Sequence, residues 1–261
     1  MKKLCLLLLL LSLSFVVGCK KEEKDSLEYV KDKGVLTIGV TDFPPMGYLE
    51  NDETVGFDID LAKLVAEKLG VELEIKYIDW ESKLFELESY AIDCVWNGMT
   101  ITDERKLQMT FSRKYLDNNL IILTLADSSI DTLADLSGKV VGVESGSSGE
   151  LAITKNISVA NSLTRLDLFG TSSEALMALQ GGSIDAMVVD EIYARYYVLK
   201  NSTQYELGTE IVGVEEYGIG FRLPDVTLCN EIDAIIDELA LEGKISIISN
   251  KWFGANLFNR D

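Results

Sequence analysis

Two stretches of the chain repeat one order of elements, and this repeat limits the possible folds more than any other feature. Residues 35–40 and 139–143 each predict a short apolar strand with a glycine before its last valine. Further along each stretch, an Ile-Asp pair opens a second apolar strand, at residues 92–96 and 184–190. Two matches in the same order indicate two lobes of similar construction.

Amphipathic helices lie between these strands. Residues 61–69 place leucine and valine on one helical face, and Gly70 provides the stop; residues 172–180 predict a second such helix. This alternation predicts an α/β protein in which each lobe is an open, mainly parallel sheet flanked by helices. Ligands of such sheets bind beyond the carboxyl ends of the strands, where Gly98 and Asp190 are expected.

Two further strand-like segments connect the repeats. Residues 120–125 form an apolar strand between the two copies, and residues 211–221 offer a second crossing. Two crossings between similar lobes would form a hinge. The expected organisation is therefore a first lobe of residues 34–119 and 215–261, and a second lobe of residues 120–214.

The N-terminus carries an export signal. Two lysines precede the apolar run 4–17, which is too short to span a bilayer comfortably and ends in a small residue followed by Cys19. This arrangement is similar to a bacterial lipoprotein signal, with an ordinary secretory signal as the alternative. We expect a signal peptide over residues 1–18, lipidation of Cys19, a charged tether over 19–33, and an extracytoplasmic protein attached to the membrane by lipid only.

Composition excludes several function classes. The formal net charge is −19, and −21 without the two lysines of the signal, which argues against nucleic acid or anionic lipid as the main partner. The chain has no histidine, so histidine metal sites and Ser-His-Asp or Cys-His catalysis are excluded, and we expect no cofactor or metal. Cys94 and Cys229 could pair, but nothing in the sequence requires a disulfide.

Residues 97–105 read Asn-Gly-Met-Thr-Ile-Thr-Asp-Glu-Arg and follow the strand that ends at Trp96. Backbone N–H groups, hydroxyls and the guanidinium of Arg105 would lie close together in such a turn, which suits a carboxylate. The alternative is an ordinary strand-to-helix turn in which Thr102 caps the helix and Arg105 is solvated.

The chain resembles the family-3 extracellular solute-binding proteins, the polar amino-acid receptors of ABC importers, from about Gly34 to Phe253. The resemblance implies the two-lobed, type II periplasmic-binding-protein fold with a two-segment hinge. Its landmarks occur in the family's order at residues 43–48, 55–62, 98–105, 111–112, 142–148, 184–186 and 217–220.

The resemblance also implies residues for the carboxylate end of an α-amino acid. Arg105 matches the arginine that pairs with the ligand α-carboxylate. Gly98 through its backbone and Thr100 through its N–H and hydroxyl match the groups that share this subsite. Ser148, from the second lobe, matches a hydroxyl near a helix start that contacts the same carboxylate.

For the rest of the ligand, Asp190 matches the carboxylate that accepts the ammonium group. Phe43 and Phe57 match two aromatic walls around the aliphatic part. Each residue also has a purely structural alternative. Asp190 could cap the helix that follows it, Phe57 could pack into the core at a helix start, and Phe43 could belong to a packed proline turn.

The side-chain subsite departs from the family pattern. Many members have an aspartate where this chain has Val40, and the nearby Asp42 is expected to face elsewhere. Glu144 matches a variable position that can line the side-chain pocket, so it is a candidate partner for a basic ligand, or else a solvated surface charge. Asn97 is the candidate partner for an uncharged polar ligand.

We therefore expect a monomeric, lipid-anchored receptor that captures a polar or charged L-amino acid and delivers it to the transmembrane subunits of an ABC permease. Two other classes remain open. One is a dehydratase on the same fold, for which Glu144 is the only obvious spare acid. The other is a ligand-sensing receptor for a separate signalling protein.

Overall fold

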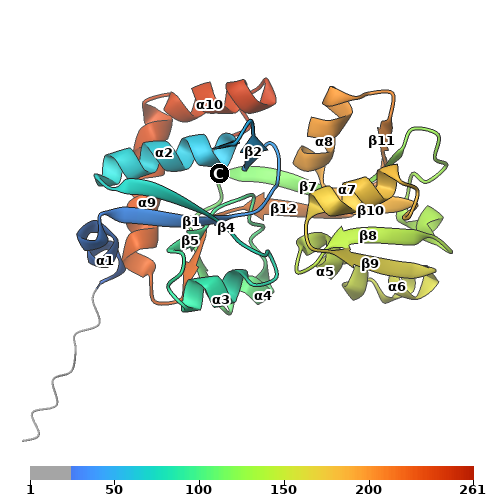
Figure 1. Cartoon of the computed structure of the whole chain (residues 1–261), viewed down its shortest axis with the longest axis horizontal. Helices are drawn as coiled ribbons and strands as arrows, with labels where there is room; N and C mark the ends of the chain where they lie inside the picture. The colour runs from blue at the N-terminus through green and yellow to red at the C-terminus, as the bar shows by residue number, and fades with distance from the viewer. Residues whose placement is uncertain (1–24) are drawn as a thin grey trace, which may run out of the picture.

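The structure is a computed structural model that describes residues 25–261, which form two lobes joined by long connecting strands (Figure 1). The first sheet has the order β4-β1-β5-β13-β6: β1 (Val35–Val40), β4 (Glu72–Tyr77), β5 (Cys94–Val95), β6 (Met109–Phe111) and β13 (Gly220–Arg222). The second has the order β11-β7-β10-β8-β9, with β12 paired to β7: β7 (Leu116–Leu125), β8 (Val140–Glu144), β9 (Arg165–Phe169), β10 (Ala186–Asp190), β11 (Tyr205–Leu207) and β12 (Gly213–Tyr217). A separate hairpin joins β2 (Tyr48–Glu50) to β3 (Glu53–Val55).

Helices lie on both sides of each sheet (Figure 1). Those of the first lobe are α1 (Ser26–Lys33), α2 (Phe57–Leu69), α3 (Lys83–Glu88), α4 (Asp103–Lys106), α9 (Val226–Leu241) and α10 (Lys244–Phe253). Those of the second lobe are η1 (Leu133–Leu136), α5 (Ser148–Lys155), α6 (Ile157–Ser162), α7 (Ser172–Gln180) and α8 (Glu191–Lys200). Across residues 25–261, none of these helices has the length and apolar character needed to cross a membrane.

The predicted two-lobed α/β fold is confirmed. In the first sheet β1 runs parallel to β4 and β5, and in the second β8 runs parallel to β9 and β10. Antiparallel strands complete each sheet, with β13 and β6 in the first and β7, β11 and β12 in the second. The largest hydrophobic cluster runs from α1 and α2 through β7 to α7 and α8.

The two Ile-Asp pairs have the same structural role. The Oδ2 atom of Asp93 accepts a hydrogen bond from the backbone N–H of Thr37 at 2.7 Å, beside the start of β1. The Oδ2 atom of Asp185 accepts one from the backbone N–H of Val140 at 2.7 Å, at the start of β8. Each aspartate therefore ties the strand that it introduces to the first strand of its own repeat.

The isoleucines explain the repeated glycines. A Cβ atom on Gly39 would lie 2.6 Å from the Cδ1 atom of Ile92, and one on Gly142 would lie 2.5 Å from the Cδ1 atom of Ile184. Since such contacts are far inside van der Waals distance, a side chain at either glycine would have to displace the tip of a buried isoleucine.

The connecting strands cross between the lobes at residues 116–120 and 213–217. The second crossing lies within the predicted segment 211–221, whereas most of the predicted first crossing, residues 120–125, pairs with β10 and β11 inside the second sheet. The first half of β7 pairs with β12, from Leu116 opposite Tyr217 to Leu120 opposite Gly213. The chain then re-enters the first sheet at β13, and α9 and α10 pack there against α1 and α2. Near the C-terminus, the backbone N–H of Asn259 bonds to the carbonyl of Tyr115, so the last residues lie beside the start of β7 (Figure 1).

The expected tether over residues 19–33 is wrong for its last eight residues, which form α1. Val30 of this helix is fully buried, and the hydroxyl of Ser26 lies 2.9 Å from that of Thr227 at the start of α9. The helix was not predicted because its short apolar face, which packs on the first lobe, lies among many charged residues. Cys19 and the expected signal peptide lie outside the described residues.

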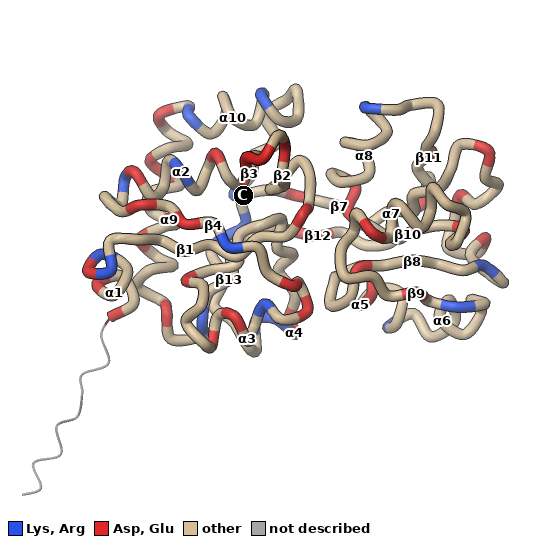
Figure 2. Tube along the Cα trace, in the orientation of Figure 1, with Lys and Arg blue, Asp and Glu red and all other residues tan. Residues whose placement is uncertain are grey.

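The charged residues and thiols add two observations. Acidic side chains are spread over both lobes, so the negative net charge does not gather on one element (Figure 2). Cys94 of β5 and Cys229 of α9 are buried free thiols, so the disulfide that the sequence left open is not present.

Candidate functional site

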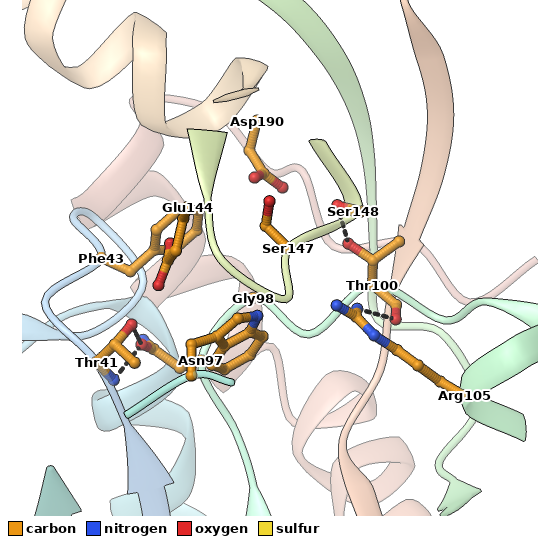
Figure 3. Close-up of a pocket in the computed structure, with 11 residues that line it drawn as sticks. Thr41, Phe43, Asn97, Gly98, Thr100, Arg105, Glu144, Ser147, Ser148 and Asp190 are labelled. Carbon is orange, nitrogen blue, oxygen red and sulfur yellow. Dashed lines mark hydrogen bonds between the residues drawn. The ribbon is translucent and has the colours of Figure 1, made fainter. Parts of the chain in front are cut away.

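A pocket with an empty volume of about 300 Å³ lies between the two lobes (Figure 3). The first lobe contributes Thr41, Phe43, Trp80, Asn97, Gly98, Thr100 and Arg105, and the second contributes Glu144, Ser147, Ser148 and Asp190. All the predicted ligand-binding residues except Phe57 line this pocket. Residues that are up to about 150 positions apart in sequence therefore meet around one small cavity.

Arg105 is held at the boundary between the lobes. The hydroxyl of Thr102 caps α4 by accepting the Arg105 N–H at 3.1 Å, as the turn alternative predicted. The guanidinium donates from Nη1 to the Thr100 carbonyl at 2.8 Å and from Nη2 to the Gly146 carbonyl of the second lobe at 3.0 Å. Burial lowers the pKa of Arg105. Because a guanidinium has five N–H donors, this fixed cation retains donors for an anion.

Hydroxyl groups lie next to this cation. The Oγ1 atom of Thr100 is 3.3 Å from the Oγ atom of Ser148, which begins α5 in the second lobe. Ser147 caps α5 by accepting the N–H of Glu150 at 3.1 Å. Free N–H groups at a helix start favour negative charge, so the guanidinium, both hydroxyls and the end of α5 make one side of the pocket suitable for a carboxylate.

Gly98 lines the pocket, but its N–H does not face it. This N–H donates to the Oδ2 atom of Asp58 at 2.7 Å, and the same oxygen accepts the Tyr115 hydroxyl at 3.0 Å. Burial raises the pKa of Asp58 to about 7. Gly98 was expected to contact the ligand through its backbone. Only its carbonyl is available for such a contact, because its N–H is bonded to Asp58 within the first lobe. A positive φ of 62° and the nearby Phe43 ring, 3.0 Å from a Cβ atom at this position, explain the glycine.

The two predicted aromatic walls differ in position. Phe43 lines the pocket and stacks on Tyr193 of the second lobe, with ring centroids 5.2 Å apart. Phe57 is 0% exposed and packs against Phe253 in the first lobe, outside the pocket. Phe57 therefore packs into the core at the start of α2, which was the structural alternative for this residue. The second aromatic residue of the pocket is Trp80.

Glu144 is the last residue of β8 and is only 6% exposed. Its Oε2 atom accepts the Ser172 hydroxyl at 2.6 Å, whereas its Oε1 atom is buried and has no hydrogen-bond partner within residues 25–261. Burial raises the pKa of this carboxyl to about 7. A buried carboxylate oxygen without a partner is costly, so this part of the pocket favours a cationic or hydrogen-bond-donating group.

Asn97 is already engaged in the first lobe. Its Oδ1 atom accepts the Thr41 backbone N–H at 2.8 Å and the Thr41 hydroxyl at 3.1 Å, and its Nδ2 atom donates to the Gly47 carbonyl at 3.4 Å. The amide therefore stabilises the loop after β1, and fewer of its hydrogen-bonding positions remain for a ligand.

Asp190 ends β10 and faces the pocket without capping α8 through its side chain. Its Oδ1 atom accepts the Asn118 amide at 2.8 Å and also the Tyr217 hydroxyl. Burial, followed by the nearby negative charge of Glu215, raises the pKa of Asp190 well above its usual range. The N-cap alternative does not describe this side chain, which is free to meet a ligand cation.

Sequence reasoning missed Thr41, Trp80 and Ser147 as pocket residues. Each follows the carboxyl end of a parallel strand, namely β1, β4 and β8. The rule that placed Gly98 and Asp190 at the ligand edge of the sheets could have found all three, because the same edge collects the residues after every parallel strand.

The lobes contact one another around the pocket. The Nζ atom of Lys83 donates to the Gly146 carbonyl at 3.2 Å, and the Ser145 hydroxyl donates to Glu81 at 2.9 Å. On another side, the Ser173 hydroxyl donates to the Oδ2 atom of Asp42 at 2.8 Å, so Asp42 meets the second lobe outside the pocket. These bonds describe a closed arrangement of the two lobes.

Comparison with known proteins agrees with this geometry. The model of the family described as bacterial extracellular solute-binding proteins, family 3, matches residues 36–255. The chain is 32% identical to the arginine-binding extracellular protein ArtP of Bacillus subtilis, over 97% of this chain and 98% of the relative. It is 31% identical to the L-cystine-binding protein TcyJ of Escherichia coli, over 88% of this chain and 87% of the relative.

Solved structures give the same result. A substrate-binding protein of an ABC uptake transporter from Streptococcus pneumoniae, with bound histidine, superimposes with a TM-score of 0.87 at 34% identity, over 90% of this chain and 98% of the other. The structure of Tv2483 bound to L-arginine gives a TM-score of 0.85 at 33% identity, over 90% of this chain and 97% of the other. From its family match, its two-lobed fold and a closed pocket between the lobes, the chain belongs to the bacterial extracellular solute-binding proteins of family 3, which are binding proteins and not enzymes.

Proposed function

We propose that this protein captures a cationic L-amino acid, with arginine as the first candidate, and delivers it to the transmembrane subunits of an ABC importer. The observation that carries this proposal is the unpartnered Oε1 atom of Glu144. Glu144 lies across the pocket from Arg105 (Figure 3). A ligand whose carboxylate meets Arg105 could therefore extend a positively charged side chain toward Glu144.

Each end of such a ligand would meet an opposite charge. The guanidinium of Arg105 and the hydroxyls of Thr100 and Ser148 would hold the α-carboxylate, and Asp190 would accept the α-ammonium. Phe43 would cover the aliphatic part of the side chain. Charge pairs of this kind stabilise a closed complex because both partners leave water together and satisfy one another.

The relatives support the class of ligand. Arginine is named in ArtP and is bound in the Tv2483 structure, and histidine is bound in the Streptococcus pneumoniae structure. TcyJ is named for L-cystine, which is why an uncharged ligand remains the competing outcome. Glu144 favours the cationic ligands, since an uncharged side chain would leave its carboxylate unpaired.

A thermal-shift screen of all proteinogenic amino acids, ornithine and cystine tests this proposal, with protein that has been unfolded and refolded to remove bound ligand. Arginine, lysine or ornithine should raise the melting temperature most, because a ligand that binds the folded state stabilises it by mass action. The Glu144→Gln variant should lose this preference, while Glu206→Gln, at an exposed position on β11, should keep it. A largest shift with glutamine or cystine in the wild-type protein would contradict the cationic ligand.

We further propose that Cys19 carries the lipid that anchors the mature protein outside the cytoplasm. The sequence pattern around Cys19 supports this proposal. Labelling of cells with a radioactive fatty acid should mark the wild-type protein and leave Cys19→Ala unmarked, with the variant released from the membrane fraction. Equal labelling of both proteins would exclude lipidation at Cys19.

A further inference from the structure

The pocket carboxylate Asp190 is held by the strands that connect the lobes. Asn118 of β7 donates to the Oδ1 atom of Asp190 at 2.8 Å, and Tyr217 of β12 donates its hydroxyl to the same oxygen. The Nδ2 atom of Asn118 also donates to the Oε2 atom of Glu215 at 2.8 Å. Glu215 lies directly opposite Asn118 in the pairing of β12 with β7. One amide therefore joins a pocket acid to an acid of the hinge.

This arrangement leaves negative charge buried without a protein cation beside it. Asp190 is 8% exposed and Glu215 is 6% exposed. Among residues 25–261, none of the ion pairs includes either carboxylate. Among the nearby acids, Glu215 has the largest charge effect on the pKa of Arg105. The guanidinium of Arg105 nevertheless donates to two backbone carbonyls and forms no ion pair with Glu215.

We propose that Glu215 is a positioning residue of the amino-binding subsite, which fixes Asp190 through Asn118 and makes capture of the ligand ammonium release a proton. This inference rests on the proposed function and deepens it. The NH2 group of Asn118 gives one N–H to each carboxylate, which holds the negative charge of Glu215 beside Asp190 in a buried site. That charge and burial both disfavour ionisation of Asp190, so Asp190 holds a proton before the ligand arrives. An ammonium group beside Asp190 stabilises the ionised form of Asp190 and expels that proton.

The surrounding groups fit this linkage. Arg105 of α4 and the hydroxyl of Tyr217 face the pair, and Glu144 belongs to the same second-lobe face of the pocket as Asp190. Glu191 follows Asp190 in the chain, but its carboxylate is occupied by Asn119 and Arg195. Burial and the charge of Glu215 raise the pKa of Asp190 well above its usual range. Ligand affinity should accordingly increase as the pH rises and Asp190 loses its proton.

Titration calorimetry of the refolded full-length protein with L-arginine, in phosphate and in Tris buffer from pH 6 to 8, counts the protons released on binding. The Glu215→Gln variant should release fewer protons than the wild-type protein, bind about 10-fold more weakly at pH 8 and show a flatter pH profile. Glu216→Gln is the matched control, because Glu216 is the next residue of β12 and pairs with Lys114 on the surface at 3.3 Å. Glu215→Asp keeps the charge and should keep the proton release.

Equal proton release and an equal pH profile in Glu215→Gln and Glu216→Gln would overturn the inference. An affinity loss in Glu215→Gln that is the same at every pH, with wild-type proton release, would reduce Glu215 to a structural role and also overturn it. If another amino acid binds in place of arginine, the same test applies with that ligand, since every amino acid carries the ammonium. A wild-type protein that binds no amino acid would contradict the proposed function itself, and this inference with it.

Discussion

The two faces of the pocket carry opposite charges. The face from the first lobe has aromatic rings and one cation, Arg105, whereas the face from the second lobe has serine hydroxyls and two acids, Glu144 and Asp190. Neither face alone could neutralise both charged ends of an amino acid. On the proposed binding mode, this difference makes ligand binding and lobe closure one process, because the two charges of the ligand would be satisfied together only when the faces meet.

Removal of the cation Arg105 is the strongest test of the opposite charges on the two faces. Arg105→Ala should weaken amino-acid binding at least about 100-fold, because the ligand carboxylate would be buried without its partner. The variant also loses the bond from Arg105 to the Gly146 carbonyl of the second lobe. Titration calorimetry would measure the loss, and circular dichroism would establish that the variant is folded.

The matched control is Arg113→Ala, since Arg113 donates to Asp237 on the exposed side of the first lobe. This variant should bind like the wild-type protein. Unchanged affinity in Arg105→Ala would mean that the carboxylate lies elsewhere, and the assignment of opposite charges to the two faces would lose its basis.

The equivalent aspartates of the repeat offer a second comparison. Asp93 is fully buried, ion-pairs with Lys33 at 2.6 Å and lies 3.8 Å from Arg222, whereas Asp185 makes its backbone bond at an exposed position. Asp93→Ala should lower the free energy of unfolding by about 3 kcal/mol, because the buried N–H of Thr37 loses its acceptor and both Lys33 and the buried Arg222 lose a carboxylate. Asp185→Ala should cost about 1 kcal/mol, since water can replace the carboxylate.

Urea unfolding of both variants would measure this difference. Equal losses would show that the shared backbone bond carries the effect, and that the ion pairs around Asp93 add nothing. A larger loss in Asp185→Ala would contradict the comparison altogether.

The first lobe also contains a buried acid, Asp58, which accepts a backbone hydrogen bond within that lobe and does not line the pocket. Asp58 holds the Gly98 N–H, and burial raises its pKa to about 7 from an ordinary value near 3.8. Between these values the folded state binds more protons than the unfolded state, so the contribution of Asp58 to stability falls as the pH rises. The free energy of unfolding of the wild-type protein should fall between pH 5 and pH 8. In Asp58→Asn this fall should be smaller by about 2 kcal/mol.

Urea unfolding at the two pH values tests this prediction. If the wild-type protein and Asp58→Asn lose stability in parallel, Asp58 is ionised throughout the range. The acids of the second lobe would then be the main source of the pH dependence.

The smallest expected effect concerns a contact between the faces. Lys83 donates across the cleft to the Gly146 carbonyl at 3.2 Å. Lys83→Met removes this bond and should speed ligand dissociation about 5-fold, which corresponds to about 1 kcal/mol. Stopped-flow measurements with Lys76→Met as the control, at a surface ion pair with Glu86, would detect the change. Identical dissociation rates would show that this bond does not stabilise the closed form.

Much of the fold could be predicted from short-range patterns. The Gly39 and Gly142 strands and the two Ile-Asp pairs occur in the structure with matching partners. The pocket positions of Gly98 and Asp190 also followed from the sequence, because residues at the carboxyl ends of parallel strands meet at one edge of a sheet. The position of Arg105 followed from the family resemblance. Periodicity did not disclose α1, whose apolar face is short and lies among charged residues.

The sequence by itself determined the repeated strands and helices, the glycines where the repeated isoleucines cross, and the residue types available at the cleft. Only the tertiary structure decided which way each side chain points. It buried Phe57 in the first lobe, brought Trp80 to the pocket, used the Gly98 N–H to bind Asp58, and joined Asp190 to Glu215 through Asn118. The physical reason is that hydrogen bonding and burial depend on partners 40 to 97 positions away, which local patterns cannot specify.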